Sequence, residues 1–236
     1  MRLLLALPVA ILTCAGPDAV APAAVAQPAA AFDARAWLRE ALPLLTDTTY
    51  AYDFDDPRTA QIKALTDRLD EAVEWRRGCD TYWDYEAGTL VYDPLPEDGG
   101  PWSRGTMTLG SRSDDEAVVV VTCNFGAYQG SYALVHLRGE RAALVTARDI
   151  RLDDGRFAPE PNAVFGTPYF DDLPPGVFET HALSRGLGDC GLHARYRLTG
   201  FGEATVLEVR ERGCDEPCET EGCLDPATWP VVFAID

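Results

Sequence analysis

The spacing of hydrophobic and polar residues changes along this chain, with the change near residue 79. Before it, Asp56 and Pro57 form a typical helix start and are followed by apolar residues at helical spacing. The apolar positions are Ile62, Leu65, Leu69, Ala72 and Val73. The pattern predicts an amphipathic helix that ends at Gly78 and packs its apolar stripe on a sheet. A shorter helix is expected over 34–45.

After Cys79 the chain contains short runs rich in β-branched and aromatic residues, separated by Gly, Pro and Asp. Such runs predict strands. We expect them near 81–86, 89–92, 105–110, 116–123, 131–138, 142–151, 177–184, 191–198, 203–212 and 230–235. Val118 to Val121 is apolar on both faces, which predicts a central, doubly covered strand. The Pro-rich, acidic stretch 159–176 is expected to be a surface loop.

Alternation also predicts how two late strands pair. Leu192, Ala194, Tyr196 and Leu198 alternate with polar residues, and Thr205, Leu207 and Val209 form a second alternating set. If both sets share one face, Tyr196 faces Thr205 and His193 lies opposite Glu208. The connection is then a four-residue loop, 199–202.

These elements predict a mainly β, α+β fold. Antiparallel β-meanders in sandwich-like sheets are expected to carry an N-terminal amphipathic helix and to be pinned by disulfides. Along the chain we expect a signal peptide over 1–26, a helical segment over 27–78 and a β-rich domain over 79–236.

The N-terminus has the features of an export signal. Arg2 precedes an apolar run from Leu3 to Leu12, and Ala24-Val25-Ala26 is a small-x-small cleavage site. A lipoprotein anchored at Cys14 is the alternative, although the two residues before it are poor lipobox residues. No later segment is long and apolar enough to span a bilayer, so we predict a soluble protein in the periplasm or outside the cell.

Six cysteines remain after removal of the signal: Cys79, Cys123, Cys190, Cys214, Cys218 and Cys223. An even number in an exported chain predicts disulfides. Of the 15 pairings that six cysteines allow, the preferred set is Cys79 with Cys123, Cys190 with Cys214, and Cys218 with Cys223. A zinc site built from the last three cysteines is the rival hypothesis, but close C-x-x-C pairs and a nearby histidine are lacking.

The formal net charge is −18, and Lys63 is the only lysine. Phosphates of nucleic acid or anionic lipid would repel such a chain, so neither is expected as a partner. A cationic envelope protein or a glycan fits better. The alternative is that the acidity only keeps the protein soluble.

Three sequence blocks resemble a known family. They are the stretch from Cys123 to Tyr132, the string Arg-Gly-Leu-Gly-Asp-Cys-Gly at 185–191, and Cys214-Asp215 followed by Trp229-Pro230. On these blocks the chain resembles the bacterial domain-of-unknown-function family 1176, best over 116–236. The resemblance implies an exported protein with no established activity or ligand. It also supports pairing Cys190 with Cys214. Glu216 departs from the pattern, in which a glycine commonly follows Cys-Asp.

The 185–191 block is a candidate binding site. Its glycines permit positive φ, and Asp189 can bond nearby backbone amides in an Asx turn. Alternatively, Arg185 and the turn amides form an anion site. Tyr128 and Gln129 lie in a second glycine-flanked turn, which is either a contact point for sugar or protein or a packed tyrosine corner.

A cationic strip is expected on the outward face of the late hairpin. It consists of His193, Arg195, Arg197 and Arg210. Arginine recognises carboxylates and phosphates with paired donors. Alternatively, the strip is a solvated sheet face neutralised by Glu208 and other carboxylates.

The sequence predicts no catalytic residue, metal or cofactor. His136, His181 and His193 lie in no known catalytic motif, and the acidic runs do not follow EF-hand spacing. We therefore expect a binding module for a protein or glycan. Alternatives are an inhibitor of a cationic, lysozyme-like cell-wall hydrolase, and an enzyme of unrecognised type that uses Asp189 and His193. An enzyme would show a concave site with a titratable pair of perturbed pKa.

Overall fold

The computed structural model describes residues 32–45, 58–84, 89–92, 105, 107–113, 115–125, 129–148, 157, 161–215, 218 and 221–235. The predictions for the signal peptide, Cys14, the helix start at Asp56 and the side chain of Tyr128 lie outside these residues. The chain from Phe32 onward forms one compact unit that contains the helices and both larger sheets. The fold is mainly β with an N-terminal helical segment, as the residue pattern predicted.

In the described part of the chain, the helices α1 (Ala34–Leu45), α2 (Arg58–Val73) and α3 (Trp75–Cys79) precede the sheets. The prediction of one helix ending at Gly78 was wrong. Glu74 takes a left-handed conformation, φ 51°, between α2 and α3. Gly78 therefore lies inside α3. The break turns the chain so that the Trp75 ring is fully buried. Leu65 and Leu69 are buried as expected.

The first sheet is an antiparallel meander in the order β3-β4-β5-β6. Its strands are β3 (Met107–Arg112), β4 (Glu116–Phe125), β5 (Gly130–Arg138) and β6 (Arg141–Leu144). A separate antiparallel pair is formed by β1 (Thr81–Asp84) and β2 (Thr89–Tyr92). Each of these strands overlaps one that the sequence predicted.

The second sheet has the order β12-β11-β10-β9-β8, with β7 parallel to β11 at one end. Its strands are β7 (Thr146–Ala147), β8 (Thr167–Tyr169), β9 (Val177–Leu183), β10 (Gly191–Gly200), β11 (Glu203–Arg212) and β12 (Val231–Ala234). The short helices η2 (Glu221–Leu224) and η3 (Pro226–Thr228) precede β12. β8 lies in the stretch 159–176, so the prediction of a loop there was wrong for these three residues. Its backbone pairs with β9.

Two apolar cores cover opposite faces of the first sheet. On one face, Val119, Val121 and Val135 pack with the helices. On the other, Val118 and Val120 pack with residues of the second sheet, among them Phe178, Tyr196 and Val206. The prediction that β4 is covered on both sides is therefore confirmed, and the layers are helices, first sheet and second sheet.

The predicted register of the β10–β11 hairpin was wrong. Tyr196 pairs with Val206 rather than Thr205, and His193 pairs with Arg210 rather than Glu208. A β-bulge leaves Leu207 without a partner between the pairs Arg195–Glu208 and Tyr196–Val206. The bulge changes which residues of β11 face the core: Ala204 and Val206 are buried in place of Thr205 and Leu207, whereas Val209 is buried as predicted.

All three preferred disulfides are present. They join Cys79 to Cys123, Cys190 to Cys214 and Cys218 to Cys223, with Cα–Cα distances of 5.3, 5.1 and 5.6 Å. The cysteines of the rival zinc hypothesis are thus bonded to one another or to Cys190. In the described part of the chain no group of three His, Cys, Asp or Glu side chains is arranged to hold a metal ion.

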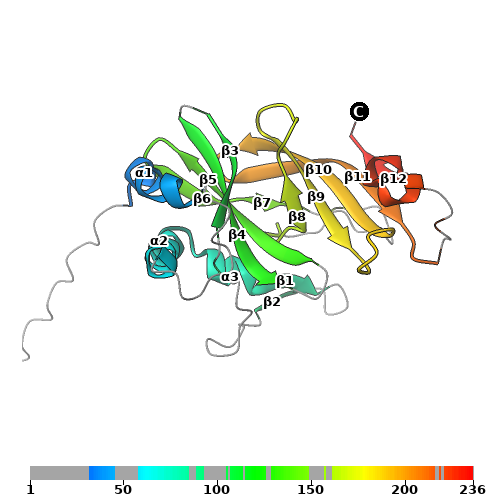
Figure 1. The fold of residues 1–236 in the computed structure, drawn as a ribbon, viewed down its shortest axis with the longest axis horizontal. Coiled ribbons are helices and arrows are strands. Elements are labelled where there is room, and N and C mark those ends of the chain that lie inside the picture. Colours follow the sequence, from blue (N-terminus) through cyan, green and yellow to red (C-terminus); the bar gives the residue numbers. More distant parts are fainter. Residues whose placement is uncertain are drawn as a thin grey trace, which may run out of the picture. The chain divides into compact units, whose positions relative to one another are not determined.

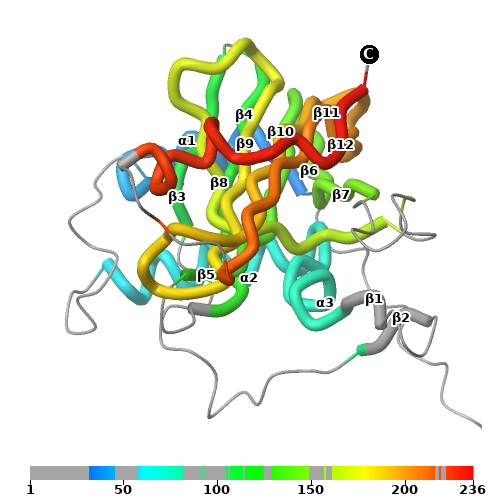
Figure 2. Tube along the Cα trace, turned by 90° about the vertical axis from the view of Figure 1, so that its right-hand side faces the viewer, coloured from blue at the N-terminus to red at the C-terminus, as the bar shows by residue number. Residues whose placement is uncertain are grey.

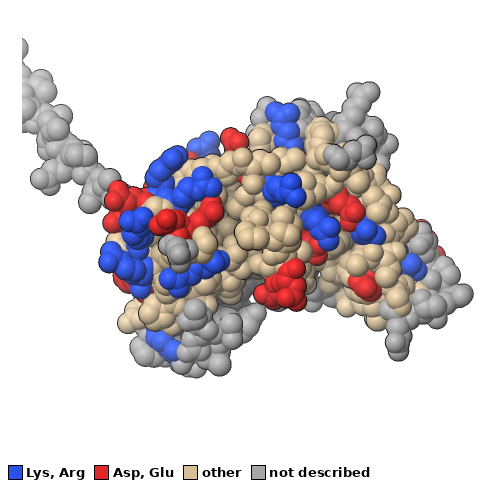
Figure 3. Space-filling view, turned by 90° about the horizontal axis from the view of Figure 1, so that it is seen from above, with Lys and Arg blue, Asp and Glu red and all other residues tan. Residues whose placement is uncertain are grey.

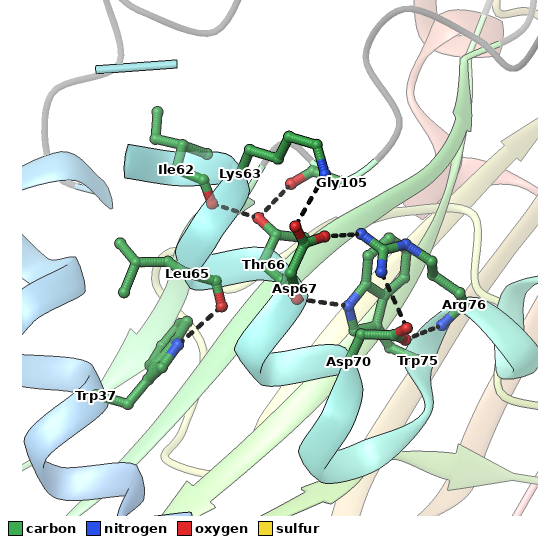
Figure 4. Close-up of polar contacts among 10 residues, drawn as sticks. All are labelled: Trp37, Ile62, Lys63, Leu65, Thr66, Asp67, Asp70, Trp75, Arg76 and Gly105. Atoms are coloured by element: carbon green, nitrogen blue, oxygen red, sulfur yellow. Dashed lines mark hydrogen bonds and ion pairs between the residues drawn. The ribbon is translucent and has the colours of Figure 1, made fainter. Parts of the chain in front are cut away.

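Two tryptophans anchor the helices to their neighbours (Figure 4). The indole N–H of Trp37 in α1 donates to Leu65 O at 3.0 Å, which ties α1 to α2. The indole N–H of Trp75 donates to Thr66 O at 3.3 Å. The Thr66 hydroxyl donates to Gly105 O at 3.0 Å, so α2 is tied to the chain just before β3.

An ion-pair network closes the outer side of this junction (Figure 4). Arg76 bonds Asp67 at 2.5 Å and Asp70 at 3.0 Å, and Lys63 bonds Asp67 at 2.8 Å. Burial would raise the pKa of the Asp67 carboxyl, but hydrogen bonds from Lys63 and Arg76 lower it. The network holds α3 at its angle to α2.

Candidate functional site

The candidate residues meet at one end and on the outer face of the second sheet. Arg185 and Asp189 lie in the turn that joins β9 to β10 (Figure 1), and His193, Arg195 and Arg197 follow on β10. We call residues 184–190 the 184–190 loop.

The 184–190 loop is closed at its base and braced across its middle. The Ser184 amide donates to Cys190 O at 3.1 Å, and the Gly188 amide donates to Arg185 O at 3.1 Å. Arg185 makes two charge-assisted hydrogen bonds to Asp189, at 2.7 and 2.5 Å. The Cys190–Cys214 disulfide joins the loop to the segment after β11. These four links hold the loop in a single conformation.

A glycine is required where the loop enters β10. Gly191 has φ 141°, and a Cβ atom there would lie 2.1 Å from Ala182 O. Gly188 has φ 72°, in the left-handed region. The prediction of positive φ in this connection is confirmed at Gly188 and Gly191, whereas Gly186 does not take a positive φ.

The Arg185–Asp189 pair shapes the electrostatics of the loop. The Asp189 side chain is 4% exposed, whereas that of Arg185 is 40% exposed. Hydrogen bonds from Arg185 lower the pKa of Asp189, and those same bonds raise the pKa of Arg185. The Arg185 guanidinium already bonds the Asp189 carboxylate. This geometry favours a structural role for residues 185–191 over an anion-binding site.

The tip of the loop is apolar and open to solvent. Leu187 is 73% exposed, the highest fraction among the large apolar side chains of the described residues. Gly186 beside it is also exposed. The sequence analysis did not single out Leu187. A leucine between two glycines in a disulfide-pinned turn is the signal that would have pointed to it.

Gln129 connects the two sheets next to this loop. Its side-chain oxygen accepts a hydrogen bond from the Leu183 amide at the end of β9. The turn before β5 and the 184–190 loop, which are far apart in sequence, therefore lie side by side. Gln129 itself serves as a packed structural link, and Tyr128 lies outside the described residues.

The cationic strip is neutralised by carboxylates on neighbouring strands. Glu179 of β9 bonds His193 at 3.2 Å and Arg195 at 2.7 Å, and Glu208 bonds Arg210 at 2.6 Å. The partner of His193 is thus Glu179, and not Glu208 as the predicted register implied. Arg197 is exposed on β10. The arrangement favours a paired sheet face over a site for a free carboxylate or phosphate.

Charge is mixed on a wider scale as well. Figure 3 shows Lys and Arg side chains beside Asp and Glu at the end that carries α1, with no large area of one sign among the described residues of that view. Ion pairs such as Arg68–Glu40 at 2.6 Å account for this pattern. The net charge of −18 is therefore a property of the whole chain rather than of one described patch on this face.

The C-terminal segment covers the histidines of the second sheet. It crosses the outer side of β9 and β10 (Figure 2), and Trp229 is 1% exposed. The Trp229 ring packs against His181 with 5.3 Å between ring centroids. His181 lies directly opposite His193 on the next strand, and its buried Nε2 has no hydrogen-bond partner among the described residues.

Acid should destabilise the protein through this half-buried histidine. Burial lowers the pKa of His181, and the neighbouring His193 lowers it further. Below the ordinary histidine pKa of about 6.5, the unfolded chain takes up a proton that the folded protein resists. Stability should therefore fall as the pH drops from about 7 toward the lowered pKa, by about 1.4 kcal/mol for each unit of separation.

Urea unfolding midpoints, measured at pH values from about 7.5 to about 5.5, follow this loss of stability. This is the range in which histidine titrates. His181→Phe keeps an aromatic ring against Trp229 and cannot take up a proton, so its midpoint should fall less than that of the wild type. If the unfolding midpoints of the two proteins fell equally with pH, the assignment of this effect to His181 would be wrong. Both proteins keep Glu179, His193 and Arg195, the charged and titratable residues near His181. A difference between the two proteins therefore reports on His181 itself.

A second buried histidine joins the two sheets. His136 on β5 is 0% exposed, bonds Glu116 at 2.5 Å and accepts a hydrogen bond from the Gly202 amide at its Nδ1, at 3.3 Å. Its proton is therefore on Nε2. Burial lowers the pKa of His136, although Glu116 opposes the shift. The ring also packs on Phe201 at 5.2 Å, so it fixes the tip of the β10–β11 hairpin to the first sheet.

One cavity lies beside the α2–α3 junction. It has a volume of about 230 Å³ and is lined by Val73, Glu74, Arg77, Gly78, Thr81, Leu144, Pro161 and Ala163. The titratable pairs with shifted pKa values, such as His136–Glu116 and Arg185–Asp189, lie elsewhere.

None of the helices in the described ranges is long and apolar enough to cross a membrane. No family model, no curated protein and no solved structure matches the chain. The resemblance to the domain-of-unknown-function family 1176 rests on the three sequence blocks alone and stays a prediction.

Proposed function

We propose that this chain is an exported binding protein of the bacterial cell envelope whose 184–190 loop engages a protein partner. The observation that carries the proposal is the exposed Leu187 at the tip of a loop held by four links. A rigid loop loses little conformational entropy on binding, so an apolar side chain at its tip contributes most of its burial energy to affinity. A leucine favours a protein partner over a glycan.

Export is supported by the cysteines. The six cysteines after the predicted signal peptide form three disulfides, and disulfides persist in the periplasm or outside the cell. Membership of family 1176 remains part of the proposal, because it would place the chain among exported proteins.

Binding through Leu187 can be tested by capture on the immobilised mature chain. We expect a partner from envelope extracts, or an added lysozyme, to stay bound at about 0.3 M salt, where exposed charges are screened. Leu187→Asp should weaken that binding by about tenfold to a hundredfold, because burying a leucine is worth about 1.5 to 3 kcal/mol. Leu224→Asp is the matched control, since Leu224 is also exposed, at 53%, but lies in η2.

Equal binding by the Leu187 and Leu224 variants would overturn the proposal. Asp189→Asn supplies a second measurement, because it weakens the brace from Arg185 without changing the tip. It should reduce affinity less than Leu187→Asp does. Retention of cationic proteins at low salt only would mean that the acidity attracts them without a specific site.

Inhibition of a cationic cell-wall hydrolase is the second candidate. The net charge of −18 favours it, because opposite charge accelerates association with a basic enzyme. The specific expectation is that the mature chain slows lysis of peptidoglycan by a cationic lysozyme at moderate salt, and that Leu187→Asp relieves the inhibition. Unchanged lysis at a protein concentration well above that of the enzyme would exclude this candidate.

A further inference from the structure

The outer edge of the second sheet carries an apolar patch that the proposed loop does not include. β12 pairs with β11 on one side, and no described strand pairs with its other side. Val231, Val232 and Ile235 are each nearly half exposed, at 47 to 48%. Phe157, 43% exposed, packs edge-on against Phe233. We call these four exposed residues, Phe157, Val231, Val232 and Ile235, the β12 patch.

The strand is held firmly although it lies near the C-terminus. Arg210 donates to Ala227 O at 2.7 Å and to Trp229 O at 3.1 Å. The Glu211 amide donates to Pro230 O, and the Ile235 amide donates to Leu207 O. The edge is therefore preformed, and a ligand that adds to it would not have to order it first.

β12 lacks the charged residues and the proline that protect other edge strands, although it is only four residues long and contains a bulge. Natural edges carry charged residues or prolines that prevent another strand from adding. β8 has Pro168 at its centre, and β3 ends in Arg112. The stretch from Val231 to Ile235 contains no charged residue and no proline. A β-bulge at Val232 leaves both valines exposed.

The free edge presents one backbone donor in particular. The Ile235 amide points to β11, since it bonds Leu207 O at 2.9 Å. Ala234 lies opposite Glu208 in the same antiparallel ladder. Because backbone amides alternate along a strand, the Ala234 amide points to the open side. An added strand would pair there.

Charge selects the partner. Residues 213–236 contain six carboxylates, Asp215, Glu216, Glu219, Glu221, Asp225 and Asp236, and no Lys or Arg. An apolar edge that acidic residues precede and follow in the sequence fits an extended segment in which apolar residues alternate with basic ones. A second copy of this chain fits poorly, because each copy carries a net charge of −18.

We propose that β12 binds an extended, basic segment of another polypeptide by strand addition. The surface is separate from the 184–190 loop and goes beyond the function proposed above. Its ligand makes backbone hydrogen bonds at Ala234 and apolar contacts with the β12 patch, while the net charge of −18 favours its Lys and Arg side chains.

The test uses the mature chain and a short peptide that alternates lysine and valine, with fluorescence anisotropy to measure the dissociation constant. Ala234→Pro should weaken binding by about tenfold or more, because proline removes the outward amide and leaves the β11 ladder intact. In the wild type, hydrogen exchange at Ala234 should slow when the peptide is added. A peptide that alternates glutamate and valine should not bind.

A matched set of variants keeps the test decisive. The double variant Val232→Lys and Ile235→Lys places charged side chains on the edge, which blocks strand addition. It replaces Ala234→Pro if the far-UV spectrum shows that Ala234→Pro does not fold. Leu187→Asp should bind the peptide as the wild type does, which separates this proposal from the function proposed above.

Three results would overturn the proposal. One is the absence of peptide binding. Another is binding that Ala234→Pro leaves unchanged and that disappears at about 0.3 M salt, which would reflect net charge alone. The last is a concentration-dependent dimer in sedimentation that Ala234→Pro abolishes, which would make a second copy the occupant of the edge.

Discussion

Replacement of Trp75 by alanine should lower the free energy of unfolding by about 3 to 5 kcal/mol, which is the usual cost of removing a buried aromatic side chain. The Trp75 side chain is fully buried against the first sheet, and the Gly105 backbone packs on its ring. Its indole N–H donates to Thr66 O, and Arg76 lies 4.8 Å above the ring. The loss therefore removes apolar contact, a hydrogen bond and a cation–π contact together.

Urea unfolding followed by far-UV circular dichroism measures this change. Trp75→Phe keeps most of the buried area and loses the N–H donor, so it should cost about 1 to 2 kcal/mol. Leu224→Ala is the exposed control and should stay within about 0.5 kcal/mol of the wild type. A Trp75→Ala protein as stable as the control would mean that α3 does not hold the helices to the sheet.

Removing a disulfide should destabilise the protein more when the segment of chain that the disulfide closes is longer. The separations are 44 residues for Cys79–Cys123, 24 for Cys190–Cys214 and 5 for Cys218–Cys223. The loop-entropy relation gives losses of about 4, 3.5 and 2 kcal/mol for the three double Cys→Ala variants. The cross-link stabilises mainly by limiting the unfolded chain, so a longer loop gives a larger effect.

The same unfolding measurement, made without reductant, ranks the three variants. A nonreducing peptide map of the wild type provides the control for connectivity. A link from Cys190 to Cys218 or Cys223 would contradict the pairing, and a larger loss for Cys218–Cys223 than for Cys79–Cys123 would contradict the loop argument. Removal of Cys190–Cys214 should also weaken binding through Leu187, because that disulfide joins the 184–190 loop to the segment after β11.

The local pattern of apolar and polar residues was sufficient to predict most of the helices and strands. α1 begins and ends where the sequence predicted, and β11 matches its predicted range. The failures occur where a tertiary contact outweighed local preference. Glu74 ends α2 early because the burial of Trp75 and the Arg76 ion pairs require a turn there. β8 forms within a Pro-rich stretch because β9 offers it a pairing edge.

The candidate site was found in part. The glycines and Asp189 of the 184–190 loop stood out by composition, because positive φ and short polar side chains are typical of tight turns. Leu187 was not predicted, because its exposure follows from its place between two glycines in the turn and not from the leucine itself. Glu179 was missed as the partner of His193, because a cross-strand partner depends on register and the bulge at Leu207 changes the register.

The sequence by itself determined the composition of this protein and most of its local structure: the acidity, the periods that separate helices from strands, and the six cysteines that form its disulfides. These depend on residue type and on spacing within one turn or one strand. Only the tertiary structure decided that the turn at Gln129 lies beside the 184–190 loop, that Trp229 covers His181, and that β12 has an open edge. Those contacts join residues far apart in the chain, and no local periodicity encodes which distant strand a residue will meet.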